Sequence, residues 1–226
     1  MRVMADAQLA RWLDALAAQK TLIAPKDVEG VLLYRPVSGR AEIVLEAGGD
    51  RPVRPVLSVK EAMFPATERL LTIEKTGQQL RLNETLPGGE QVIFGVRPCD
   101  ARGVRALDAA FLETEPVDRY YARRRALTTL VGLACRAMGE SCFCTSVGGA
   151  PDDPTGLDLL LTEVEGGYAV QVVTDRGEAL LDGIPLEDVP GEPPPPILND
   201  PIPVPGKEAW PPHFNDHYWA EVPSAA

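Results

Sequence analysis

The sequence has few histidines, a deficit of basic residues and no long apolar run. Its 22 Lys and Arg residues against 33 Asp and Glu residues give a net charge of −11, the wrong sign for binding nucleic acid. The apolar runs are far shorter than the roughly 20 residues of a membrane helix. Only two histidines occur, His213 and His217. We therefore expect a cytoplasmic protein with neither nucleic acid nor membrane as partner, and few groups for general-base catalysis.

Nucleotide-binding motifs are also missing. Neither G-x-G-x-x-G nor G-x4-G-K-[ST] is present, so local motifs predict no nucleotide site, although a flavin bound without a motif stays open. His213 and His217 are four residues apart, but the prolines around them favour surface imidazoles over metal ligands. The run from Arg123 to Arg125 is typical of a solvated helix face, and we assign it no role.

Glycine and proline, in contrast, are plentiful, with 20 and 22 residues. They indicate many turns between short elements, and the 45% of apolar residues are enough for a core. We predict an α+β (mixed α/β) fold in residues 1–190, with a short-stranded sheet, a few flanking helices and an irregular Cys-rich loop from 135 to 150. Residues 191–226 are predicted to form a Pro-rich tail or docking arm, because nine of the twenty residues from Pro193 to Pro212 are proline. Aromatic residues near the end of this tail would anchor it.

Spacing and turn residues predict the individual elements. Leu9, Trp12, Leu13 and Leu16 repeat at helical spacing. The remaining predictions are a helix over 6–19, hairpins of 31–37 with 41–47 and of 157–165 with 168–174, a short helix within 58–74 broken at Pro65, a strand at 80–82, and a short helix over 175–183.

Two buried strands are predicted to end at a cysteine. Residues 91–96 form a short apolar run that leads into Cys99, and Asp100 is a plausible N-cap for the helix that follows. A second apolar run, 126–134, follows a helix capped by Asp118 and ends at Cys135. Each strand end therefore delivers one thiol.

The chain has four cysteines, and three of them lie within ten residues. They are Cys99, Cys135, Cys142 and Cys144. Iron-sulfur clusters are commonly held by four thiolates, and the chain has no others. In extended backbone Cys142 and Cys144 would face the same side at a separation of roughly 6.5 Å. The glycines around them allow the loop to fold back and expose amides to sulfur.

Four other interpretations of these cysteines remain open. A zinc site needs the same number of ligands, but its usual signature is two C-x2-4-C pairs. A Cys142–Cys144 disulfide would close a strained ring. Cys99 beside Asp100 is a possible catalytic nucleophile, although it lacks a histidine partner. Unrelated buried thiols explain single cysteines better than they explain C-x6-C-x-C.

Three strings carry a family resemblance: FGVRPCDARGVRALDAAFL, DRYYARRR, and the C-x6-C-F-C-T-S-x-G-G string with the GLDLLLTEVEGGY that follows it. Over residues 58 to 220 the chain resembles the beta subunits of soluble NiFe hydrogenases (sulfhydrogenases) and the corresponding iron-sulfur subunits of anaerobic sulfite reductase. Those are cytoplasmic iron-sulfur electron-transfer proteins. The resemblance implies one 4Fe-4S cluster on Cys99, Cys135, Cys142 and Cys144.

The resemblance also implies partners. They would be a flavin- and nicotinamide-binding reductase subunit, together with ferredoxin-like, hydrogenase or sulfite reductase subunits. We expect an electron-transfer subunit of a cytoplasmic oxidoreductase complex, without substrate chemistry of its own. The alternative is a non-catalytic scaffold subunit of such a complex, with zinc or without metal. The family continues into a ferredoxin-like region, whereas this sequence ends at Ala226, so those further clusters are expected on another chain or are lost.

Overall fold

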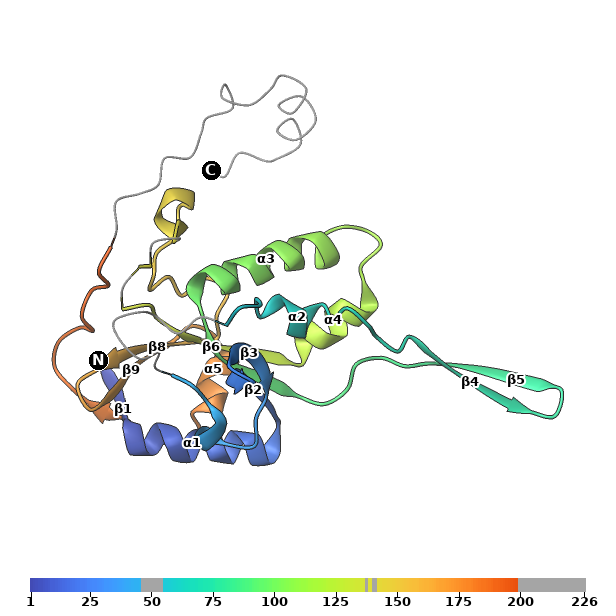
Figure 1. The fold of residues 1–226 in the computed structure, drawn as a ribbon, viewed down its shortest axis with the longest axis horizontal. Coiled ribbons are helices and arrows are strands. Elements are labelled where there is room, and N and C mark those ends of the chain that lie inside the picture. The colour runs from blue at the N-terminus through green and yellow to red at the C-terminus, as the bar shows by residue number, and fades with distance from the viewer. Residues whose placement is uncertain (46–54, 137, 140–141, 199–226) are drawn as a thin grey trace, which may run out of the picture.

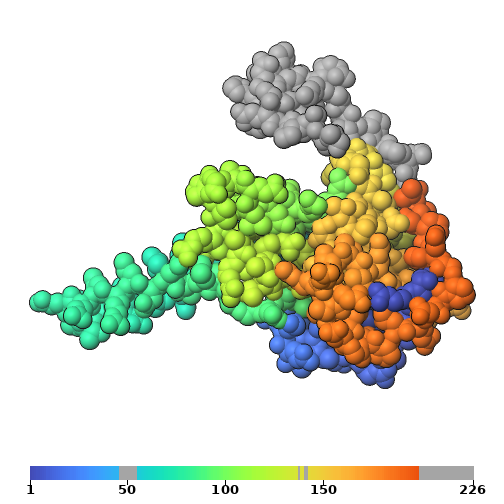
Figure 2. Space-filling model, turned by 180° about the vertical axis from the view of Figure 1, so that it is seen from behind, coloured from blue at the N-terminus to red at the C-terminus, as the bar shows by residue number. Residues whose placement is uncertain are grey.

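The computed structural model describes residues 1–45, 55–136, 138–139 and 142–198. An eight-stranded sheet has helices on both faces, and a separate two-stranded hairpin projects from the body (Figures 1 and 2). The predicted mixed α/β class is confirmed. The strands are β1 (Arg2–Ala5), β2 (Thr21–Val28), β3 (Val31–Pro36), β4 (Leu71–Thr76), β5 (Gln79–Glu84), β6 (Gln91–Val96), β7 (Thr128–Leu133), β8 (Leu159–Val164), β9 (Gly167–Val172) and β10 (Glu187–Asp188). The α-helices are α1 (Asp6–Gln19), α2 (Lys60–Met63), α3 (Pro98–Leu112), α4 (Arg119–Ala126) and α5 (Asp175–Leu180), and the 3-10 turns are η1 (Arg40–Glu42) and η2 (Cys144–Val147).

The strand order of the large sheet is β10-β1-β9-β8-β7-β6-β2-β3. Its four central strands, β8, β7, β6 and β2, are parallel, whereas the outer strands pair antiparallel. Parallel strands end at the same edge of a sheet, so the segments that follow β6 and β7 emerge side by side. These are the segments that carry Cys99 and Cys135.

Two hydrophobic clusters cover the two faces of the sheet. On one face α1 and the end of α5 pack on the sheet, with Trp12 and Leu13 of α1 fully buried. On the other face α2, α3 and α4 pack around Met63, Val104 and Tyr121. Strand β6 sends alternate side chains into each cluster, which explains why residues 91–96 read as a nearly continuous apolar run.

Several predicted elements are confirmed. The helix over 6–19 forms with all four apolar residues of its stripe buried, and Asp118 caps α4 by accepting from two backbone amides. The strands at 91–96 and within 126–134, the hairpin of β8 with β9 and the short helix after it are present. The helix predicted within 58–74 is confirmed only as α2, which ends before Pro65, and the end of that segment is strand β4.

The predicted hairpin of 31–37 with 41–47 is wrong. Strand β3 pairs with β2 instead, around a turn at Glu29 and Gly30 whose φ angles are +54° and +83°. Glycine adopts such angles readily, but a glutamate gives no sequence signal of one. The predicted second strand contains η1 instead.

The predicted N-cap role of Asp100 is also wrong. Helix α3 begins at Pro98, with Arg97 as its N-cap. Proline suits this position, because the N–H that it lacks would have no helical partner there. Asp100 lies in the first turn, where its carboxylate accepts a hydrogen bond of 2.6 Å from the Ser58 hydroxyl.

The Pro-rich segment is described only as far as Leu198. There the N–H of Ile197 donates to the Arg136 carbonyl at 2.8 Å, and the N–H of Met138 donates to the Ile197 carbonyl at 3.0 Å. The segment therefore lies against the loop that follows Cys135. The predicted aromatic anchor and both histidines lie outside the described residues, and the division at residue 190 stays a prediction. Within the described ranges, no helix has the length and hydropathy to cross a membrane.

Candidate metal centre

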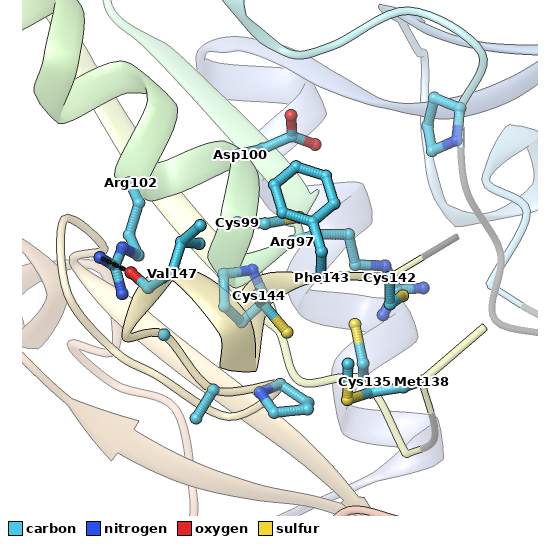
Figure 3. A pocket seen from close by; sticks show the side chains of 15 residues that line it. Arg97, Cys99, Asp100, Arg102, Cys135, Met138, Cys142, Phe143, Cys144 and Val147 are labelled. Carbon is cyan, nitrogen blue, oxygen red and sulfur yellow. Dashed lines mark hydrogen bonds between the residues drawn. The ribbon is translucent and has the colours of Figure 1, made fainter. Parts of the chain in front are cut away.

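All four cysteines line one cavity of about 360 Å³ at the edge of the sheet where β6 and β7 end (Figure 3). The chain positions of these cysteines span 46 residues, so the fold itself brings them together. The lining residues are Pro55, Arg97, Pro98, Cys99, Asp100, Arg102, Cys135, Met138, Cys142, Phe143, Cys144, Val147, Gly149, Ala150 and Pro151. Apart from Pro55, they come from the start of α3 and from the loop between β7 and β8.

The first wall is built by the end of β6 and the start of α3. Gly95 has a φ of +78° and interrupts the register between β6 and β7, so Phe94 pairs with Val131 and Val96 with Gly132. A Cβ at Gly95 would lie 3.1 Å from the side chain of Pro25, so the position also needs a small residue. Cys99 follows in the first turn of α3, at the exposed rim of the cavity.

Arg97 is a buried cation in this wall. Its side chain is 7% exposed, and its guanidinium donates to the carbonyl oxygens of Leu133 and Ala134 at 3.1 and 3.3 Å. These carbonyls end β7 just before Cys135. Arg97 therefore ties the two strand ends together and places a positive charge in the wall of the cavity.

The second wall is the loop after β7. The N–H of Cys135 donates to the Pro151 carbonyl at 2.9 Å, which closes the loop on itself. The N–H of Gly139 donates to the Cys142 sulfur at 3.2 Å. An amide donor of this kind stabilises a thiolate and is typical of cysteine ligands.

Arg102 of α3 holds the far part of this loop. Its guanidinium donates to the carbonyls of Gly148 at 2.5 Å and Val147 at 3.1 Å, and it lies 3.5 Å from an oxygen of Asp153. Gly148 has a φ of +72° and ends η2, the turn that begins at Cys144. Arg102 thus fixes the position of η2 relative to Cys99 on the same helix.

The electrostatics of the cavity favour protonated thiols in the metal-free protein. Shielding from water raises the pKa of the Cys99 thiol to about 11, and Asp100, Cys135 and Cys144 add to the rise. Burial, with a further contribution from Asp100, also raises the pKa of Tyr34 well above its usual range, and the Tyr34 hydroxyl donates to the Gly95 carbonyl at 2.9 Å. A cation that binds four thiolates here would displace their protons.

The residues fit an iron-sulfur cluster. None of the four cysteines forms a disulfide, so the Cys142–Cys144 disulfide is absent. Within the described residues no three His, Cys, Asp or Glu side chains are grouped tightly enough for one metal ion, and the thiols instead surround a larger space. The hydroxyls of Thr145 and Ser146, next to Cys144, are buried and have no hydrogen-bond partner among the described residues. Soft thiolates and spare donors are what a sulfide-containing group requires.

Sequence reasoning missed the two arginines of the site. Arg97 and Arg102 both bind backbone carbonyls of the loop segments, and these partners lie more than 30 positions away along the chain. No local motif marks such a contact. The one available signal was an arginine directly before Pro98-Cys99.

Comparison with known proteins supports the same chemistry. Over 128 residues, 57% of this chain, the sequence is 34% identical to sulfhydrogenase 2 subunit beta of Pyrococcus furiosus. The chain is similar to a hydrogenase beta subunit. The predicted resemblance is thereby confirmed for the hydrogenase side, whereas the likeness to a sulfite reductase subunit stays a prediction.

The similarity is partial for both proteins. The aligned part covers 36% of the sulfhydrogenase subunit, so this chain spans about a third of that protein. No family model matches the sequence, and no solved structure matches it.

Proposed function

We propose that this chain is an electron-carrying subunit of a hydrogenase-type complex and holds one 4Fe-4S cluster. Cys99, Cys135, Cys142 and Cys144 would be its ligands. The observation that carries the proposal is that all four cysteines of the chain line the same cavity. Similarity to a protein named as a sulfhydrogenase subunit supports the assignment to a complex.

The cluster would supply single-electron exchange, and the chain's own residues would set where and how easily an electron is held. Arg97 offers a buried positive charge that favours an added electron. The Gly139 amide, through its bond to the Cys142 sulfur, acts in the same direction by withdrawing negative charge from the ligand. Met138, which is 8% exposed, limits access of water to the inner wall.

The partners proposed are a flavin- and nicotinamide-binding reductase subunit, together with ferredoxin-like or hydrogenase subunits. A chain with one cluster can pass electrons only across a docked interface. The rim of the cavity carries the exposed apolar side chains of Phe143 and Val147, which suits such contact. We place the protein in the cytoplasm, where thiols stay reduced.

Metal analysis of the anaerobically purified full chain tests the proposal. We expect a brown protein with about four irons and four sulfides per chain and an electron paramagnetic resonance signal after reduction. A colourless protein with stoichiometric zinc would instead support the scaffold alternative. A metal-free protein would contradict both metal assignments.

A matched pair of variants tests the ligand set. Cys142→Ala removes a proposed ligand and should abolish the four-iron content. Met138→Leu removes a sulfur that is not a thiolate and changes the volume little, so the iron content should stay at the native level. Equal iron in both variants would reject Cys142 as a ligand.

A further inference from the structure

The hairpin of β4 and β5 is a solvent-exposed arm. It forms a two-stranded sheet of its own, and every residue of both strands is exposed. Figures 1 and 2 show it extending away from the body. An isolated two-stranded hairpin is marginally stable in water, so an arm of this kind gains from a surface that covers it.

One face of the arm is apolar and the other is polar. Ile73 lies opposite Leu82, and Lys75 lies opposite Leu80, and directly paired residues share a face. Alternation along the strands then places four aliphatic side chains, each 53% to 66% exposed, together on this face: Leu71, Ile73, Leu80 and Leu82. The opposite face carries only polar side chains, from Thr72, Glu74, Thr76, Gln79, Arg81 and Asn83. An exposed aliphatic stripe of this kind marks an interaction surface.

The body holds the root of the arm in a defined direction. The Tyr120 hydroxyl of α4 donates to the Leu70 carbonyl at 3.0 Å, and Arg119 forms an ion pair with Glu84 at 3.1 Å. Arg124 of the same helix pairs with Glu68 and also donates to the Met63 carbonyl at 3.1 Å. Helix α4, to which the sequence assigned no role, therefore orients the arm instead of forming only a solvated face.

We propose that the aliphatic stripe docks on a different subunit, into an apolar strip that presents a carboxylate to Lys75. Lys75 lies on the aliphatic face and makes no ion pair with any residue that the structure describes. Residues 68–86 contain three acidic and three basic side chains, so the arm is neutral on a chain of net charge −11. A second copy would bring another charge of −11 to the interface, which disfavours self-association. The choice of a redox subunit for the partner rests on the proposed function.

Photocrosslinking of the full chain in its native host tests this docking. A photoreactive residue replaces either Ile73, on the aliphatic face, or its neighbour Glu74, on the polar face. We expect the Ile73 position to crosslink to a different polypeptide, identified by mass spectrometry as a redox-complex subunit, with a yield about fivefold or more above that of the Glu74 position. Ile73→Ser should lower recovery of that subunit by about tenfold, whereas Glu74→Ser should leave it within about twofold. Lys75→Glu should also lower its recovery.

Three results would overturn the proposal. They are crosslinks that join two copies of this chain, equal yields from the two faces, and no crosslink from the Ile73 position. Iron measured in the same preparations separates this failure from failure of the proposed function. Full iron without an Ile73 crosslink rejects only the docking arm, and a crosslinked chain without iron rejects only the cluster.

Discussion

The guanidinium of Arg97 donates a hydrogen bond to the carbonyl oxygen of Leu133 at 3.1 Å. This contact joins the residue that follows β6 to the last residue of β7. The next cysteine along each segment is a proposed ligand, Cys99 and Cys135. One buried side chain thus sets the spacing of two parts of the candidate site.

Arg97→Met should destabilise the protein and shift its redox potential. Loss of the guanidinium leaves the Leu133 and Ala134 carbonyls without this donor, so the free energy of unfolding should fall by about 2–3 kcal/mol. The midpoint potential should become more negative, because a cation that favours the added electron is gone. Denaturant unfolding and potentiometric titration measure the two effects. Arg11→Met, at an exposed arginine that contacts only exposed Gln8, should change neither. An unchanged potential in Arg97→Met would show that this charge does not act on the cluster.

Arg102→Ala should loosen η2 while leaving the body folded. The variant loses bonds to the Val147 and Gly148 carbonyls, and because the side chain is 36% exposed we expect a loss of about 1 kcal/mol. Hydrogen exchange should show faster exchange at residues 144–149, and Arg102→Lys should show an intermediate effect. Native exchange rates in Arg102→Ala would mean that the arginine does not hold the loop.

The metal-free protein should show an alkaline titration of Cys99. Its thiol has a pKa raised to about 11, so it is protonated at neutral pH, and its alkylation by iodoacetamide should accelerate about tenfold per pH unit up to that value. Asp100→Asn removes a negative neighbour and should move the profile to lower pH. Peptide mapping of the alkylated protein measures both rates. A Cys99 thiol that alkylates fully at neutral pH would contradict this account.

Ile197→Pro should weaken the contact between the Pro-rich segment and the loop after Cys135. Proline lacks the N–H that donates to Arg136, so we expect a loss of about 1 kcal/mol and faster hydrogen exchange at Met138. Ile197→Ala keeps this N–H, and the Ile197 side chain is 70% exposed, so that control should behave like the native protein. Equal behaviour of the two variants would exclude a role for the backbone bond.

The sequence predicted those parts of the fold in which local pattern and tertiary packing agree. Helix α1 and strands β6 and β7 follow directly from apolar spacing, and the four cysteines were the correct residues to examine together. The turn at Glu29 was missed because only its backbone angle marks it. The arm was recognised only at 80–82, because its strands bury no face in the body and so lack the contacts that usually define a strand.

Native mass spectrometry of the anaerobically purified chain, compared with Cys99→Ala, tests the central claim most directly. Cys99 is the ligand that comes from the other wall of the cavity, so its role shows whether the two walls share one group. The account predicts a native mass increment of four irons and four sulfides, and loss of that increment in Cys99→Ala. A native chain without the increment, or a Cys99→Ala chain that keeps it in full, would contradict the account.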